Sequence, residues 1–94
     1  MTITQLKYVL AVAEHKNFTT ASDNCFVTQP TLSMQIQKLE EELNVVIFNR
    51  KKKPIELTPI GEKIVEQAKV ILDESNRIND IVDQQKGYIG GDFK

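Results

Sequence analysis

The sequence contains few of the residues that build redox, metal or aromatic sites. Its 94 residues include one cysteine, Cys25, and one histidine, His15. One cysteine cannot form a disulfide within the chain, and these two residues are too few for a four-ligand zinc site. Tryptophan is absent, and aromatic residues make up only 6% of the chain. We therefore expect no metal or cofactor, and a small core of aliphatic side chains.

Long apolar runs and catalytic groupings are also missing. No stretch approaches the roughly 20 apolar residues that a membrane-spanning helix needs. The N-terminal residues MTITQLKYVLAVAEHKNF lack a basic segment followed by an apolar one, so we expect a cytoplasmic protein. No acid, base and nucleophile occur in a pattern typical of a catalytic site, so we do not expect an enzyme. We interpret His15 as a helix-end residue and not as a catalytic base.

The chain lacks the excess of positive charge that is typical of nucleic-acid-binding domains, because its formal net charge is −1. The charge is unevenly distributed, however. Through Leu57 there are seven lysines and arginines against six acids, and from Thr58 onward there are five against seven. Four of the early cations are contiguous: Arg50, Lys51, Lys52 and Lys53. A local basic patch is therefore available to an anionic partner.

Helical spacing of apolar residues predicts a first helix over about 4–15, with Thr2 or Thr4 as its N-cap. The apolar positions are Leu6, Val9, Leu10 and Ala13. A short second helix follows, with Thr19 as the expected cap and with Ala21 and Cys25 on its inner side. We therefore interpret Cys25 as a buried, inert thiol and not as a redox sensor.

A third helix has a well-specified start. Thr28 is the expected N-cap, Pro30 lies in the first turn, and Val27 and Leu32 form a hydrophobic staple. One buried stripe follows, made of Leu32, Ile36, Leu39 and Leu43. The opposite face is polar and nearly uncharged up to Glu40, with Gln29, Thr31, Ser33, Met34, Gln35, Gln37 and Lys38. Uncharged amides and hydroxyls are suited to reading the edges of DNA bases.

The next segment predicts a β-hairpin with a cationic tip. Residues 45–48 are β-branched and aromatic, residues 49–54 are polar, and residues 55–57 alternate apolar and polar. Three helices followed by a hairpin make a winged helix-turn-helix, which places its third helix in the major groove of DNA. The predicted fold is therefore mainly α, with this DNA-binding domain over residues 1–58.

The last segment predicts a long linker helix over residues 59–87, capped by Thr58 and ending near Gly87. Its apolar seam has the 3.5-residue period of a coiled coil and is made of Ile64, Ala68, Ile71, Ser75, Ile78 and Val82. A single small domain would leave so long a seam uncovered. We therefore expect the seam to pair with a second copy, and we expect Ile71 to lie outside the winged core.

Three stretches together resemble the LysR-type transcriptional regulators of bacteria. They are LKYVLAVAEHKNFTTAS, VTQPTLSMQIQKLEEELNVVIFNR and IELTPIGEKIVEQA, which span most of the chain. Within the family, AEHKNF, the position of Cys25 and QPTLSMQIQKLEEEL are most similar to the peroxide-sensing branch. The resemblance implies antiparallel pairing of the linker helices and a C-terminal effector-sensing domain. That domain is absent from these 94 residues. We therefore expect part of a longer protein, with residues 88–94 beginning a hinge and any sensing cysteines lying elsewhere.

The resemblance also implies roles for individual residues. By the match to QPTLS, the expected base-reading residues are Gln29, Pro30, Thr31 and Met34, although Met34 replaces an arginine often found in the family. The expected phosphate contacts are Thr28, Ser33, Lys38, Arg50, Lys51, Lys52 and Lys53. Two alternatives stay open. In one, Thr28 serves only as a helix cap, and in the other the basic run is only a solvated loop.

The leading hypothesis is a homodimer that binds an inverted-repeat DNA operator and controls oxidative-stress genes. In the full-length protein, a higher oligomer and contact with RNA polymerase are further expected partnerships. One alternative is a LysR-type regulator of another pathway that responds to a small-molecule effector. The other is a protein-interaction module that uses the winged fold only as a scaffold. A scaffold would not need the QPTLS face beside a cationic hairpin.

Overall fold

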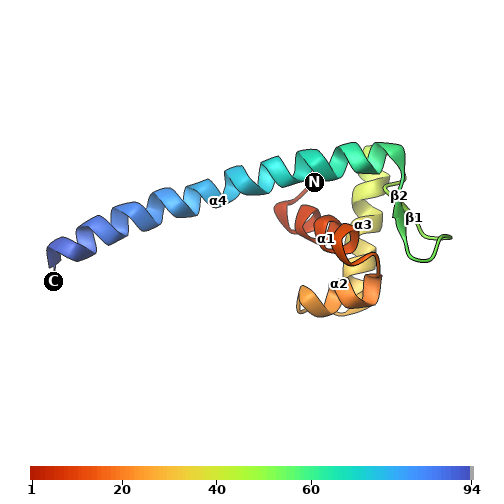
Figure 1. Ribbon diagram of the computed structural model, residues 1–94, viewed down its shortest axis with the longest axis horizontal. Helices are drawn as coiled ribbons and strands as arrows, with labels where there is room; N and C mark the ends of the chain where they lie inside the picture. The colour runs from red at the N-terminus through yellow and green to blue at the C-terminus, as the bar shows by residue number, and fades with distance from the viewer. Residues whose placement is uncertain (94) are drawn as a thin grey trace.

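The computed structural model describes residues 1–93, and the side chains of residues 1–86. Its elements, in chain order, are α1 (Ile3–His15), α2 (Phe18–Asn24), α3 (Gln29–Leu43), β1 (Phe48–Asn49), β2 (Glu56–Leu57) and α4 (Pro59–Phe93). Helices α1 to α3 and the hairpin gather beside the N-terminal half of α4, and the rest of α4 projects away from them (Figure 1). The molecule measures 57 × 24 × 20 Å. The predicted winged helix-turn-helix with a long final helix is confirmed.

Side-chain caps begin the first two helices. The Thr2 hydroxyl accepts a hydrogen bond from the Gln5 backbone N–H, and the Gln5 side chain accepts one from the Thr2 N–H, both at 3.0 Å. At α2 the cap is Asn17, whose Oδ1 accepts from the Thr20 N–H at 2.8 Å. The prediction of Thr19 as this cap was wrong. Asparagine is a stronger cap than threonine, and the earlier start brings two more residues, Phe18 and Thr19, into a short helix.

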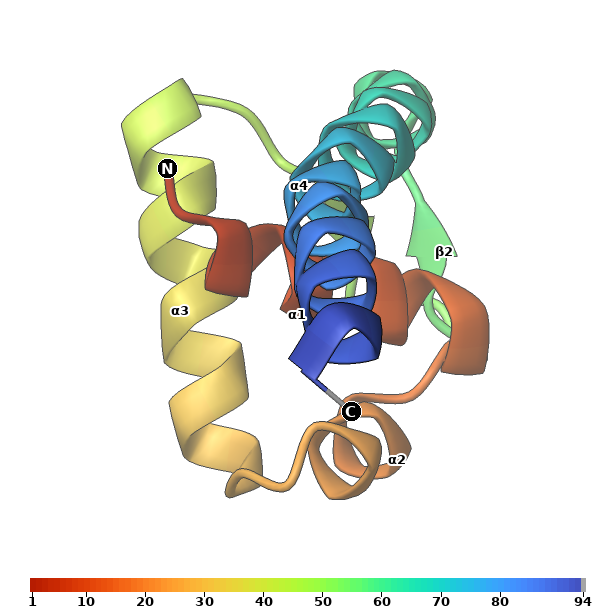
Figure 2. The ribbon, with the colours of Figure 1, turned by 90° about the vertical axis from the view of Figure 1, so that its left-hand side faces the viewer.

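The core lies where α1 packs against α2, α3 and α4. Figure 2 shows α3 on one side of α4 and β2 on the other. The least exposed apolar side chains come from every helix and from the wing: Leu6, Val9, Val12, Phe18, Ala21, Leu32, Ile36, Leu39, Ile47, Phe48, Val65 and Ala68. Leu43 was expected in this stripe but is 37% exposed. Leu43 is the last residue of α3, followed by the C-cap Asn44, so it lies at the exposed end of the helix.

The wing hairpin is shorter than the sequence pattern predicted. Its register pairs Phe48 with Leu57 and Asn49 with Glu56 in antiparallel strands. The predicted strand over residues 45–47 does not form. The Ile47 N–H donates at 2.7 Å to the Glu40 carboxylate, and not to a strand partner. The Glu40 side chain of α3 therefore replaces one hydrogen bond that a neighbouring strand would otherwise make with Ile47.

The start of α4 is held against the segment that leads into β1. The Thr58 hydroxyl accepts from the Gly61 N–H at 3.0 Å, which confirms Thr58 as the N-cap. The same hydroxyl donates to the carbonyl of Val46 at 2.5 Å, and the Thr58 N–H donates to the carbonyl of Ile47 at 2.9 Å. This one threonine therefore joins the long helix to the base of the wing.

Helix α4 continues to Phe93, so the prediction that it ends at Gly87 was wrong. A glycine permits a left-handed helix end but does not impose one, and keeping glycine inside a helix costs only about 1 kcal/mol relative to alanine. Residues 88–93 of the predicted hinge are helical, and Lys94 lies outside the described residues. The hinge role stays a prediction.

The predicted seam of α4 divides into two halves. Ala68 is buried, and Ile64 and Ile71 are partly buried against the winged core. Farther along, Ile78 and Val82 are 64% and 42% exposed. The expectation that Ile71 lies outside the core was therefore wrong. The first half of the seam packs against the chain's own helices, and only the second half is uncovered.

Candidate nucleic-acid interface

The residues predicted to read DNA bases lie together at the start of α3. Gln29, Pro30 and Thr31 are exposed in its first turn, and Met34, one turn later, is 52% exposed. This end of α3 is the end farther from α4 (Figure 1). The adjacent helix α2 and this exposed end form the helix-turn-helix pair, whose second helix is the one suited to a DNA groove.

The first turn of α3 has no side-chain cap. The Thr28 hydroxyl lies 2.8 Å from the Thr31 hydroxyl, and it makes no capping hydrogen bond to the helix backbone. Helices α1 and α2 both use a side chain for this purpose. The alternative that Thr28 serves only as a side-chain cap therefore does not match its hydrogen bonding. The backbone N–H groups at the start of α3 are suited to donate to an acceptor such as a phosphate oxygen.

The polar face of α3 divides along its length. Gln37 and Lys38 are exposed and Ser33 is half-buried. Gln35 instead accepts a hydrogen bond at 3.2 Å from the Gln5 side chain on α1. The phosphate-binding candidates Ser33 and Lys38 therefore differ in accessibility, and Gln35 joins two helices of the domain.

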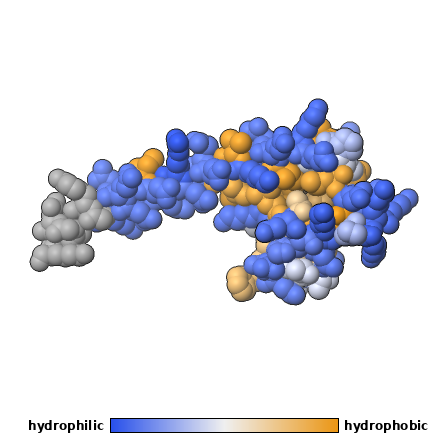
Figure 3. Space-filling model, in the orientation of Figure 1, coloured by the Kyte–Doolittle hydropathy of each residue, from blue (hydrophilic) through white to orange (hydrophobic). Residues whose placement is uncertain are grey.

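The wing presents three exposed lysines between its strands, namely Lys51, Lys52 and Lys53. Figure 3 shows a hydrophilic projection at this end of the molecule. Lys52 Nζ lies 3.7 Å from Glu56 Oε2, with both side chains more than half exposed. Such an exposed pair contributes little and is readily exchanged for another anion. The three amines are therefore available to a phosphate backbone.

Arg50 has a different environment. Its Nη1 lies 3.0 Å from Glu40 Oε1, and its guanidinium lies 5.1 Å from the centroid of the Phe18 ring. Glu40 is nearly buried, which the sequence pattern did not predict because Glu40 opens an acidic run. The available signal was its position four residues after Ile36, beside the buried stripe.

A hollow of about 460 Å³ brings the recognition end of α3 next to the wing. Its lining includes His15, Lys16, Asn17, Phe18, Thr19, Gln29, Lys53, Pro54 and Ile55. The Ile55 N–H donates to the carbonyl of Lys16 at 3.3 Å, which ties the base of the wing to the end of α1. Sequence analysis missed Lys16, whose left-handed backbone at φ 55° ends α1. Lys16 therefore lines the same hollow as Gln29 and Lys53.

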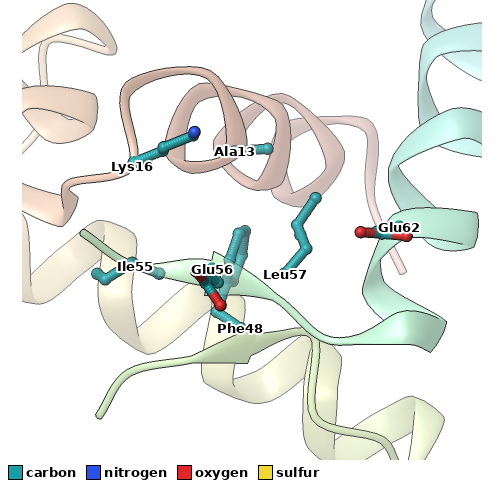
Figure 4. A pocket seen from close by; sticks show the side chains of 7 residues that line it. All are labelled: Ala13, Lys16, Phe48, Ile55, Glu56, Leu57 and Glu62. Atoms are coloured by element: carbon teal, nitrogen blue, oxygen red, sulfur yellow. The ribbon is translucent and has the colours of Figure 1, made fainter. Parts of the chain in front are cut away.

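A second hollow, of about 370 Å³, lies between the end of α1, the wing strands and the start of α4 (Figure 4). Two carboxylates, Glu56 and Glu62, line it together with the amine of Lys16. Acidic groups repel phosphate, so this hollow is poorly suited to DNA. The side of the wing that adjoins Gln29 is the better candidate for a nucleic-acid surface.

The turn between α2 and α3 contains Cys25 and Phe26. Cys25 is half-buried and not buried as predicted, because it is the C-cap of α2 and lies at the edge of the core. Burial nevertheless raises the pKa of its thiol, which disfavours the reactive thiolate. Phe26 is 94% exposed with a left-handed backbone at φ 59°. No sequence pattern had singled out Phe26.

The described residues show neither a metal-binding cluster nor a membrane-spanning helix. No group of three or more histidine, cysteine, aspartate or glutamate side chains is arranged to hold a metal ion there. None of the helices described has a stretch that is both long enough and apolar enough to span a bilayer.

Comparison with known proteins gives a consistent result. Residues 3–62 match the family described as "Bacterial regulatory helix-turn-helix protein, lysR family". A hydrogen peroxide-inducible genes activator of Pectobacterium carotovorum subsp. carotovorum is 42% identical over 91 residues, covering 97% of this chain and 30% of the relative. The chain therefore spans about a third of the length of that relative.

Solved structures extend the likeness to three dimensions. A full-length OxyR variant from Pseudomonas aeruginosa superposes with a TM-score of 0.87 at 43% identity, covering 92% of this chain and 29% of that one. The DNA-binding domain of BenM, in complex with benA site 1 DNA, superposes with a TM-score of 0.85 at 34% identity. That match covers 89% of this chain and 94% of the BenM chain.

Proposed function

The chain belongs to the lysR family of bacterial regulatory helix-turn-helix proteins, and we propose that it binds an inverted-repeat DNA operator as a homodimer. The predicted similarity to the peroxide-sensing branch is confirmed by the likeness to OxyR and to a peroxide-inducible activator. One observation carries the proposal. The exposed first turn of α3, which has no side-chain cap, lies beside a lysine-rich wing.

In the proposed complex, α3 enters the major groove. The Gln29 amide can donate to and accept from an adenine edge, Thr31 can hydrogen-bond a base or touch a thymine methyl, and Pro30 and Met34 make apolar contacts. Thr28, Ser33 and Lys38 contact phosphates that flank the groove. The complex of the structurally similar BenM domain with DNA supports this mode of binding.

The wing then contacts the sugar-phosphate backbone beside the recognition helix. Lys51, Lys52 and Lys53 supply its positive charge, and Lys16 extends the same surface from α1. A net charge of −1 over the chain does not oppose this arrangement, because a phosphate responds mainly to charges within about one Debye length, roughly 8 Å at physiological salt.

The exposed half of α4 supports dimerisation. Ile78, Ile81 and Val82 are 64%, 58% and 42% exposed, and they recur at helical spacing on the part of α4 that projects from the winged core. A second α4 can cover this stripe in the antiparallel arrangement implied by the family. Two recognition helices related by a two-fold axis then require an inverted repeat.

Over the full-length protein, we propose control of oxidative-stress genes in the cytoplasm, with no enzymatic activity. The likeness to OxyR supports this pathway. RNA polymerase and further copies of the protein are the proposed partners at the promoter. A small-molecule effector in place of peroxide is the alternative, since the match covers only 30% of the length of the peroxide-inducible relative.

The test is selection of bound fragments from random duplex DNA, followed by affinity measurements with Gln29→Ala. We expect an inverted repeat, and a loss of about 1–3 kcal/mol per lost base contact on that site. Binding of Gln29→Ala to random DNA should change little. Gln37→Ala, an exposed amide two turns farther along α3, is the matched control. If no sequence is enriched, the protein-interaction alternative is favoured.

A further inference from the structure

The recognition helix and the wing are joined by one carboxylate. Glu40 Oε2 accepts from the backbone N–H groups of Ile47 at 2.7 Å and Phe48 at 3.4 Å. Glu40 Oε1 accepts from Arg50 Nη1 at 3.0 Å. The Glu40 side chain is only 9% exposed. Both oxygens are therefore committed to the segment that begins the wing.

Arg50, the charged partner of Glu40, also contacts α2. The Arg50 guanidinium lies 5.1 Å from the centroid of the Phe18 ring, which belongs to the first turn of α2. Phe18 in turn meets Phe48 edge to face, with ring centroids 6.0 Å apart and planes at 72°. Helices α2 and α3 and strand β1 therefore converge on the Glu40–Arg50 pair.

Glu40 is also mechanically connected to the base-reading residues. It follows Gln29 within one uninterrupted helix, so the two residues are about 16 Å apart along the axis at 1.5 Å per residue. A rigid helix transmits its orientation over this distance. The contacts of Glu40 with Ile47 and Arg50 therefore connect the position of the wing to that of Gln29.

The same contacts compete with DNA for Arg50. Its side chain is 40% exposed, so a phosphate could reach it. Moving the guanidinium to that phosphate would leave Glu40, a nearly buried carboxylate, without its charged partner. Unpairing a buried charge is more costly than one exposed ion pair can return. Arg50 should therefore stay with Glu40 when DNA binds.

We propose that the Glu40–Arg50 pair is a clamp that fixes the wing relative to α3, and that Arg50 positions the wing without contacting phosphate. This inference rests on the proposed DNA-binding function and deepens it. It revises the phosphate role expected of Arg50 from the sequence. A wing held at one angle contacts the DNA backbone only when Gln29 is aligned with the bases that it reads. The clamp therefore favours specific over non-specific DNA.

The test compares neutral variants for affinity and for the slope of log affinity against log salt, on the selected operator and on random DNA. Arg50→Gln should weaken operator binding about tenfold and leave the salt slope unchanged. Lys51→Gln is the matched control, because removing one phosphate contact should reduce the slope by about 0.9 per protomer. Arg50→Lys keeps the charge but loses the planar, stacked guanidinium, and it should restore operator binding only in part.

Glu40→Gln provides an independent readout, with its exposed neighbour Glu41→Gln as the control of equal charge change. We expect Glu40→Gln to free Arg50, raise the salt slope on random DNA by about 0.9 per protomer and reduce the operator preference. Glu41→Gln should leave that preference intact. Circular dichroism and thermal melting verify that the variants fold. If Glu40→Gln does not fold, the Arg50 variants alone test the clamp.

A lower salt slope for Arg50→Gln, matching that of Lys51→Gln, would overturn the clamp and make Arg50 a phosphate contact. Sequence-specific binding by the unmutated protein would survive that result. If the unmutated protein instead prefers no sequence, the proposed function fails first, and the clamp loses its role with it. The two failures are therefore distinguishable.

Discussion

A Cβ atom on Gly61 would lie 2.2 Å from the carbonyl oxygen of Ile47. Gly61 is in the first turn of α4, and Ile47 leads into the wing, so glycine allows the helix to approach this backbone. The Thr58 hydroxyl, which caps Gly61, holds the same segment from the other side. The close backbone approach at Gly61 and the hydroxyl of Thr58 thus together join α4 to the wing.

We expect Gly61→Ala to lower the free energy of unfolding by about 1–3 kcal/mol, because the added methyl must displace backbone atoms. Urea denaturation measures this change. Glu62→Ala, at the exposed neighbouring position, is the control and should change stability little. Equal stability of Gly61→Ala and the unmutated protein would contradict the close approach.

Phe26 carries backbone strain that asparagine would relieve. Its φ of 59° lies in the left-handed region, and its side chain is 94% exposed, so little packing is lost on replacement. We expect Phe26→Asn to raise the free energy of unfolding by about 1 kcal/mol. Asn44→Ala, at the left-handed end of α3, should have the opposite effect. Denaturant midpoints test both, and a less stable Phe26→Asn would indicate that the ring has packing partners.

The two halves of the α4 seam should respond differently to charge. The double variant Ile78→Asp and Val82→Asp should abolish dimerisation and leave the thermal transition of the winged core unchanged, because both residues are exposed. Ile71→Asp should destabilise the core, because Ile71 packs against it. Sedimentation equilibrium and thermal melting separate these outcomes. A monomeric unmutated protein at micromolar concentration would remove this interface from the proposal.

The three wing lysines should contribute affinity without sequence preference. Replacing Lys51, Lys52 and Lys53 together by alanine should weaken operator and random DNA alike, and reduce the salt slope by nearly one per lost phosphate contact. Gln29→Ala is the comparison, since it should lower affinity for the operator alone. A salt slope that does not change in the triple variant would exclude the wing from the phosphate footprint.

Cys25 should be unreactive near neutral pH. Burial raises the pKa of its thiol above the ordinary value, so less thiolate is present at any given pH than in a free cysteine. The rate at which iodoacetamide alkylates Cys25 should therefore increase with pH at higher pH values than the rate for glutathione does. Peroxide should leave the DNA affinity unchanged both in the unmutated protein and in Cys25→Ser. A reversible loss of affinity in peroxide that Cys25→Ser abolishes would identify a redox role.

The sequence alone was sufficient for features that depend on neighbouring residues. Thr58 and Pro59 indicated the start of α4, Thr28 and Pro30 indicated the start of α3, and period and alternation indicated three helices followed by a hairpin. The exposed position of Gln29 followed from the same pattern, because helical periodicity assigns opposite faces to apolar and polar residues. These interactions lie within about one helical turn, and a sequence window contains them completely.

Tertiary structure decided which of several equivalent groups found partners. Glu40 resembles the acids that follow it, but only Glu40 faces the N–H of Ile47 and the guanidinium of Arg50. That pairing takes the Ile47 N–H out of the strand ladder and gives Arg50 a partner within the domain. The seam of α4 likewise has one continuous period, and its first half is covered because α1 and β2 pack against α4. Such outcomes depend on where separate elements meet in space, which local spacing does not specify.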